Sequence, residues 1–425
     1  MGVGLIITVV LVICFALTVP IALSLGLTSA VVILQSDLPS IVIVQRLFTS
    51  IDSFPLMAVP FFILAGNLMG YGGISKRLIA FASTLVGPMA GGLGIVTIVA
   101  CMFFAAVSGS GPATTAAIGS IMLPAMIASG YDKRFSSATI AAAGQLGVVI
   151  PPSIPMVLFG VAASASIGDL FLGGVLPGIL IGGSLCLVMF ITSKKRGYVG
   201  SRSYSNAERW AALKDAFWAL LMPVIILGGI YSGQFTPTEA AVVASVYSLF
   251  VGFFIYKELK FSDLKPVFCE SAIVFSIIMI LLSTAGLFGW VMAINDIPHA
   301  LMDWFAGVVS GPVTFFLLVN IMLLFIGMFF DGGATIIILA PMLVPVAKSF
   351  GIDPVHFGVV MVANLAMGYI TPPFGVNLFV ACELAKIKME EMTRSIILYV
   401  VVLLTDLAII SYFPALTLWL PNVLR

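Results

Sequence analysis

Charged residues are scarce in this chain. Of its 425 residues only 9% are Asp, Glu, Lys or Arg, whereas 61% are hydrophobic, and the mean hydropathy is +1.21. Ordinary soluble domains carry about 25% charged residues, so this composition excludes one. It is typical of an all-α polytopic membrane protein, whose spans are long apolar helices.

Histidine and cysteine are also scarce, with two and five copies. Each cysteine stands singly among apolar neighbours, which indicates packing residues rather than disulfides or metal ligands: Cys14, Cys101, Cys186, Cys269 and Cys382. His299 and His356 fit no metal-ligand pattern, and we expect both to be solvated residues at the membrane interface.

The absence of a His-Glu-x-x-His run excludes a zinc protease, and the absence of a Gly-Lys-Ser/Thr loop argues against an ATP-driven pump. A net charge of +1 gives no bulk attraction for nucleic acid, so no nucleic acid partner is expected.

A glycine-broken, hydroxyl-rich stretch at residues 105–124 recurs later in the chain. Ser110, Gly111, Ala113, Thr114 and Pro124 match Asp331, Gly332, Ala334, Thr335 and Pro345 at one displacement, since 331 − 110 = 345 − 124 = 221. The same displacement relates Pro151-Pro152 to Pro372-Pro373 and Asp132 to Asp353. A constant displacement predicts two copies of one unit, each with a hairpin broken at its tip and a helix broken at Pro-Pro.

The apolar spans and breaks predict four regions. These are 1–53, N-terminal spans and an interfacial arm; 54–170, a first repeat with hairpin 92–128 and broken helix 136–163; 171–270, connecting scaffold spans with a basic cytoplasmic loop at 194–215; and 271–425, a second repeat with hairpin 313–348, broken helix 354–385 and a last span. When the spans alternate, all lysines and arginines except Arg46, Lys348 and Arg425 fall on one side, which we assign to the cytoplasm. The two hairpins then enter from opposite sides, as in the inverted repeats of secondary transporters.

The broken helices predict a site for a cation beside a site for an anion. Backbone breaks at membrane depth must be satisfied by protein, water or ligand, and the two Pro-Pro pairs release carbonyls from helical hydrogen bonding. Carbonyl, hydroxyl and carboxylate oxygens suit Na+. The candidate Na+ ligands are Ser108, Ser110, Gly147, Val148, Asp331, Thr335, Gly368, Tyr369 and Thr371. Helix starts favour anions, and the candidate substrate-binding residues are Gly109, Gly111, Thr114, Pro152, Ser153, Gly332, Gly333 and Pro373.

Several of these residues also have a purely structural interpretation. Ser108 and Ser110 could cap or kink helices, and Asp331 could cap the helix that follows it, although their recurrence in two copies favours the site. Asp406 has no counterpart in the first copy, so we expect it to meet another helix or another subunit. Glu239 is expected to act as a helix cap with Thr236.

Other function classes fit the sequence less well. An intramembrane serine protease would need a base for Ser110, and both histidines lie outside the membrane core in this topology. A channel stays open as an alternative, because hairpins can line pores.

Four motifs carry a resemblance to a known family. The hairpin at Val107–Gly119, the break at Ile150–Pro155, the loop at Phe235–Ala241 and the break at Ile370–Asn377 resemble the large membrane (M) subunit of tripartite ATP-independent periplasmic (TRAP) transporters. The resemblance covers essentially the whole chain. It implies an elevator-type Na+ symporter that imports organic acid anions, often dicarboxylates or sialic acids, across the bacterial inner membrane.

The resemblance also implies two protein partners. One is a periplasmic substrate-binding protein that delivers the solute, and the other is a small membrane subunit of about four helices on a separate chain. A stand-alone Na+/dicarboxylate symporter of related design is the alternative. Such carriers place Ser-Asn-Thr at the corresponding tips and breaks, whereas this chain has Ser-Gly-Ser-Gly and Asp-Gly-Gly at its tips, which favours the tripartite system.

Overall fold

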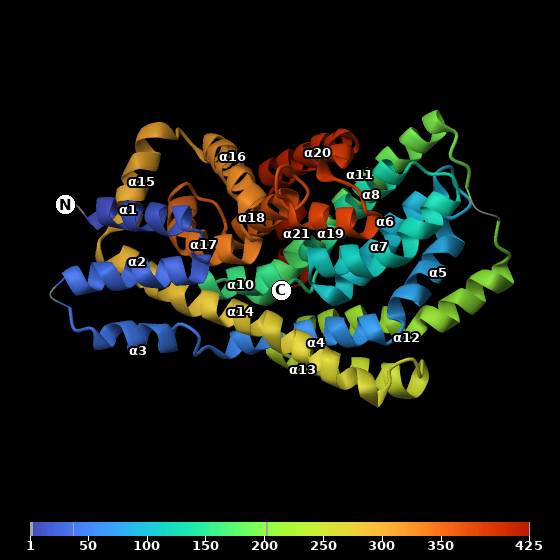
Figure 1. The fold of residues 1–425 in the computed structure, drawn as a ribbon, viewed down its shortest axis with the longest axis horizontal. Helices are drawn as coiled ribbons and strands as arrows, with labels where there is room; N and C mark the ends of the chain where they lie inside the picture. Colours follow the sequence, from blue (N-terminus) through green and yellow to red (C-terminus); the bar gives the residue numbers. More distant parts are fainter. Residues whose placement is uncertain (1–2, 37, 201–202, 425) are drawn as a thin grey trace.

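The computed structural model describes residues 3–36, 38–200 and 203–424, together with all side chains in them except those of 298, 299, 301 and 306. Every regular element in these residues is helical (Figure 1), and nine helices are long and apolar enough to cross a membrane. The prediction of an all-α polytopic membrane fold is confirmed. Arg202, Arg425 and the side chain of His299 lie outside the described residues.

The N-terminal region forms a pair of short helices and an arm. The pair consists of α1 (Val3–Ala16) and α2 (Ile21–Gln35), which pack against each other. With 15 residues α2 is about 22 Å long, shorter than the roughly 30 Å hydrocarbon core. The arm, α3 (Ile41–Thr49), packs on α14 (Phe261–Ile294), where the guanidinium of Arg46 lies 4.8 Å from the ring centre of Trp290.

A second group of helices packs beside the two hairpins. In it α4 (Ala58–Tyr71) packs on α13 (Pro237–Phe250), and α5 (Ile74–Val86) packs on α12 (Asn206–Tyr231). The α13 helix continues as one wider turn to Ile255. Its start is the predicted capping box: Thr236 Oγ1 accepts from the Glu239 N–H at 3.3 Å, and Glu239 Oε2 accepts from the Thr236 N–H at 2.8 Å.

The displacement of 221 residues holds for the helices themselves. The first hairpin is α6 (Gly92–Ser108) with α7 (Gly111–Ala128), and its broken helix is α8 (Lys133–Gly144), α9 (Leu146–Val149) and α10 (Ile154–Ala162). The second hairpin is α16 (Pro312–Phe329) with α17 (Gly332–Ser349), and its broken helix is α18 (Pro354–Gly368) and α19 (Val376–Ala385). The starts of α7 and α8 therefore recur in α17 and α18, since 332 − 111 = 354 − 133 = 221. Both Pro-Pro bonds are cis, again in equivalent places.

The first hairpin and the helix that follows the second hairpin contact α11 (Ile167–Arg196) near its opposite ends. Near its C-terminal end, Met189 lies against Gly94 at the base of α6. Near its N-terminal end, Gly173 lies against Val355 at the start of α18. The 16 residues between the two contacts (189 − 173) correspond to about 24 Å of helix.

Figure 1 shows the same placement, with α5 leading into the first hairpin on the right and α15 (Ile297–Val308) leading into the second on the left. The inverted orientation of the two repeats and the four-region division stay predictions.

The C-terminal end corrects two expectations. The last span is α20 (Met389–Tyr412), and a further helix that the sequence did not predict, α21 (Ala415–Leu424), packs on α11. His356 is not solvated: its ring nitrogens lie 2.7 Å from Thr417 Oγ1 and 3.1 Å from the Ser411 carbonyl oxygen. The prediction was wrong because α21 covers the start of α18.

Candidate functional site

The tips of both hairpins line one cavity of about 250 Å³. Six of the candidate residues reach its wall: Gly109, Ser110, Val148, Asp331, Gly333 and Tyr369. The rest of the wall includes Ile154 and Leu158 of α10 and Val274 and Ile277 of α14. Residues about 221 positions apart in sequence are thus brought together, beside α14.

The tip of the first hairpin is joined to the first break. Gly109 has the left-handed backbone conformation (φ 62°) that glycine adopts at little cost, and its carbonyl accepts from the Ile154 N–H at 3.3 Å. Ser110 caps α7, with Oγ accepting from the Ala113 N–H at 3.4 Å. The Ser110 carbonyl accepts from the Thr114 hydroxyl at 2.8 Å.

Close packing fixes this tip against α9. A methyl group at Gly147 would lie 2.4 Å from the Ser110 carbonyl oxygen and 2.5 Å from Thr114 Oγ1, so only glycine fits there. Ser108 is buried behind the tip, with its hydroxyl 2.8 Å from that of Thr114. Gly147, Ser108 and Thr114 therefore shape the site from behind the cavity wall.

In the second hairpin, Asp331 caps α17 and also lines the cavity. Its Oδ2 caps α17 by accepting from the N–H groups of Gly333 (2.8 Å) and Ala334 (3.2 Å). The side chain is exposed to the cavity, and Oδ1 accepts from the Tyr369 hydroxyl at 3.3 Å. Thr335 is buried, and its hydroxyl donates to the Asp331 carbonyl at 3.0 Å.

Three of the four carbonyls that the proline pairs release from helical hydrogen bonding accept other donors. The Val148 carbonyl accepts the Ser153 hydroxyl at 2.5 Å, the Gly368 carbonyl accepts the Thr371 N–H at 3.2 Å, and the Tyr369 carbonyl accepts the Asn377 N–H at 3.0 Å. Ser153 and Asn377 follow their proline pairs, whereas Thr371 directly precedes Pro372. Because a carbonyl oxygen has two lone pairs, each of the three still has one for a cation.

The remaining candidates do not line this cavity. Thr371 is buried and donates its hydroxyl to the Met367 carbonyl at 2.7 Å. Like Thr371, these residues are absent from the wall: Gly111, Pro152, Ser153, Gly332, Thr335, Gly368 and Pro373. Gly332 is nevertheless tied to the wall, because its N–H donates to the Tyr369 hydroxyl at 3.2 Å.

Two buried side-chain amides lie beside the breaks, and the sequence analysis did not predict either of them. Asn377 is fully buried; its Nδ2 donates to the Ala141 carbonyl at 3.3 Å, and its Oδ1 has no hydrogen-bond donor among the described residues. That oxygen lies 3.2 Å from where a methyl group on Gly111 would sit. Gln145, the residue before α9, is also buried. Neither its Nε2 nor its Oε1 has a hydrogen-bond partner in the described part of the chain. A polar residue within an apolar helix was the signal available in the sequence.

The donor set suits an alkali cation. No group of three or more His, Cys, Asp or Glu side chains comes together within residues 3–36, 38–200 and 203–424, as far as side chains are described. Carbonyl, hydroxyl and single carboxylate oxygens remain, and these hard oxygen ligands match Na+ rather than a transition metal.

Asp406 has a structural partner, as expected. It is buried in α20 and hydrogen-bonds to Ser184 of α11.

Comparisons with known proteins agree with this architecture. Residues 8–416 match the family model of the tripartite ATP-independent periplasmic transporter, DctM component. The chain is 46% identical to the isethionate TRAP transporter permease protein DctMQ of Oleidesulfovibrio alaskensis over 94% of its own length, and it spans 64% of that relative. It is 41% identical to the C4-dicarboxylate TRAP transporter large permease protein DctM of Rhodobacter capsulatus, covering 95% of this chain and 96% of that one.

A solved structure shares the fold. The YdaH transporter of Alcanivorax borkumensis superposes with a TM-score of 0.62 over 89% of each chain, at 14% identity. The relatives are transporter permeases, so this chain is a transport protein and not an enzyme. Taken together, the match over almost the whole length and the nine spans show that this chain belongs to the family of large membrane subunits, the DctM component, of tripartite ATP-independent periplasmic transporters, multi-pass proteins of the bacterial inner membrane.

Proposed function

We propose that this chain is the membrane carrier of an Na+-coupled importer for an organic acid anion of the dicarboxylate or sialic-acid class. The observation that carries the proposal is the cavity where both hairpin tips meet. There Ser110 and Asp331 line a mostly apolar wall beside the starts of two helices, α7 and α17.

Sodium would bind to oxygens at the tips and breaks. Ser110, Val148 and Asp331 line the cavity, and each has an oxygen with a lone pair that a cation can use. Asp331 is the one carboxylate of the two tips, and an ionisable group at membrane depth is functional by default. Its negative charge attracts a cation and disfavours an anion until that cation is bound, so Na+ binds before the acid.

The organic acid would bind at the helix starts. The N–H groups at the first turns of α7 and α17 and the positive ends of their dipoles favour a carboxylate once Asp331 is neutralised. The cavity of about 250 Å³ is large enough for a small acid but not for a peptide.

Transport would proceed by movement of the repeats against the scaffold. The cavity is closed on one side by Val274 and Ile277 of α14, so an elevator-type displacement along α14 would carry the site across the membrane. Gly109 and Ser110 would move with α10, to which the tip is bonded.

Two partners complete the proposed system. A periplasmic binding protein delivers the acid, and a small membrane subunit of about four helices on a separate chain accompanies the scaffold. The names of the similar proteins support acids as substrates, because one refers to isethionate and another to C4-dicarboxylate.

The experiment is uptake into proteoliposomes. Proteoliposomes contain this chain and the small subunit, and a panel of labelled acids is added together with the binding protein from the same gene cluster. The measurement is then repeated without the binding protein. The proposal expects import of at least one acid that stops without the binding protein. Full activity without it would instead support a stand-alone Na+/dicarboxylate symporter.

A further inference from the structure

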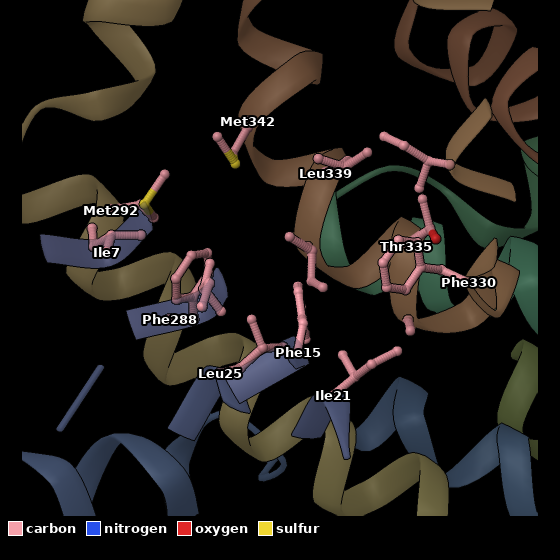
Figure 2. Close-up of a pocket in the computed structure, with 14 residues that line it drawn as sticks. Ile7, Phe15, Ile21, Leu25, Phe288, Met292, Phe330, Thr335, Leu339 and Met342 are labelled. Carbon is pink, nitrogen blue, oxygen red and sulfur yellow. The ribbon is translucent and has the colours of Figure 1, made fainter. Parts of the chain in front are cut away.

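A second cavity lies between the N-terminal helix pair and the second hairpin, away from the site at the tips. Its volume is about 320 Å³. One wall belongs to α1, α2 and α14 and the other to the second hairpin. Figure 2 shows its side chains, which include Phe15, Leu25, Phe288, Leu339 and Met342.

The chemistry of this cavity excludes a charged ligand. Thr335 is the one lining residue with a polar side chain, and its hydroxyl already donates to the Asp331 carbonyl at 3.0 Å. An organic acid would lose its hydration there and gain no partner. The volume is roughly twice that of an apolar cavity of about 150 Å³ that stays dry and takes up benzene.

The surroundings of the cavity are lipid hydrocarbon. Its walls α14, α16 and α17 are long and apolar enough to lie within a membrane, and α1 exposes Leu5, Val9 and Val12. Phe15, at the rim, is 40% exposed. The apolar molecule present at high concentration at this depth is the acyl chain of a phospholipid.

We propose that this cavity binds one acyl chain of a membrane phospholipid and that the chain stabilises the position of the second hairpin against α1, α2 and α14. The ring centres of Phe15 and Phe330 are 5.9 Å apart, and Phe330 directly precedes Asp331 at the tip. A bound chain contacts both walls, so it favours the arrangement in which they face each other. The effect on the hairpin rests on the proposed function, because it requires that the hairpin move, whereas the binding does not.

Photo-crosslinking tests the binding. The purified transporter is reconstituted with phosphatidylcholine that carries a diazirine near the end of one acyl chain, illuminated and analysed by mass spectrometry. We expect label on the peptides of Leu11 and Met342, which line the cavity, at several times the level on Leu317 and Ile321, which are exposed on α16.

Filling the cavity provides the specific control. Leu11→Trp combined with Met342→Trp should lower the label on the cavity peptides at least fivefold, whereas Leu5→Trp, a side chain of α1 that is 51% exposed and outside the cavity, should leave it unchanged. Monodisperse elution in size-exclusion chromatography verifies that each variant folds. Equal label on cavity and α16 peptides, or undiminished label in the filled variant, would overturn the proposal. Loss of cavity label when the small membrane subunit is added would assign the surface to that subunit and overturn it as well.

Uptake separates the two parts of the proposal. The filled variant should import the acid at least threefold more slowly, at an unchanged half-saturating Na+ concentration. The reason is that the two tryptophan side chains hold the second hairpin against α1, α2 and α14. Reduced label with normal uptake would overturn the effect on the hairpin. Absence of Na+-driven uptake in the unmodified protein would contradict the proposed function and leave the labelling result standing.

Discussion

The hydroxyl oxygen of Tyr369 lies 3.3 Å from Oδ1 of Asp331, which joins the second break to the tip of the second hairpin. The same hydroxyl accepts from the Gly332 N–H at 3.2 Å. The Tyr369 ring also reaches the first hairpin, where a methyl group on Gly111 would lie 3.3 Å from it. One side chain therefore contacts both tips and orients the carboxylate that faces the cavity.

Tyr369→Phe should weaken Na+ binding without preventing folding. It leaves the buried Gly332 N–H without its partner, at a cost of about 1–3 kcal/mol, and releases Asp331 Oδ1. We expect the Na+ concentration for half-maximal uptake to rise several-fold. Tyr412→Phe removes a hydroxyl bonded to the Val313 carbonyl, away from the cavity, and should leave that concentration unchanged. Equal values for both variants would remove Tyr369 from the site.

Asp331→Asn separates the cap from the charge. The amide oxygen can still cap α17, since asparagine caps helices as well as aspartate, but the negative charge is lost. We expect about a tenfold higher Na+ requirement, equivalent to about 1.4 kcal/mol. The matched control is Asp353→Asn, because Asp353 caps α18 by accepting from the Val355 N–H at 2.7 Å and lies outside the cavity wall. If the two variants transport alike, Asp331 serves only as a cap.

Gly147→Ala should abolish import. The added methyl group would lie 2.4 Å from the Ser110 carbonyl oxygen, so the first tip must shift away from α9. Gly183→Ala is the control, because nothing lies within 4 Å of a methyl group there and alanine favours a helix. Uptake measured beside the amount of folded protein in the membrane distinguishes a displaced site from lost protein; normal uptake by Gly147→Ala would contradict the described packing.

Pro152→Ala should lower uptake at least tenfold. Alanine supplies an N–H that can bond to the Val148 carbonyl in helical geometry, in competition with the Ser153 hydroxyl. The break between α9 and α10 could then close, and the lone pair offered to the cation would be lost. Pro223→Ala, which changes a proline within the scaffold helix α12, should transport normally. Wild-type uptake by Pro152→Ala would mean that the break is not needed for function.

Much of the fold was accessible from the sequence because local chemistry determines it. Glycine and proline at fixed spacing predicted the tips at Gly109 and Gly332 and both breaks, and the capping pair Thr236 and Glu239 predicted the start of α13. Each of these signals depends on a few neighbouring residues, so no tertiary information was needed.

Contacts between distant elements could not be predicted in this way. The partners of His356 depend on α21, which lies about 60 residues later in the chain and folds back over α18. The donors that satisfy Val148 and Tyr369 come from turns whose exact path the sequence does not determine. Asn377 was overlooked because its role depends on Gly111, which belongs to the other repeat.

Coupled fluxes test the central claim, that sodium bound where the two tips meet drives import of the acid. Proteoliposomes with the complete system would be supplied with radioactive sodium and labelled acid together. The account predicts that both enter in a fixed ratio, that uptake of the acid ceases when choline replaces sodium, and that Asp331→Asn requires more sodium for the same rate. Acid uptake that continues at the same rate in choline would contradict it.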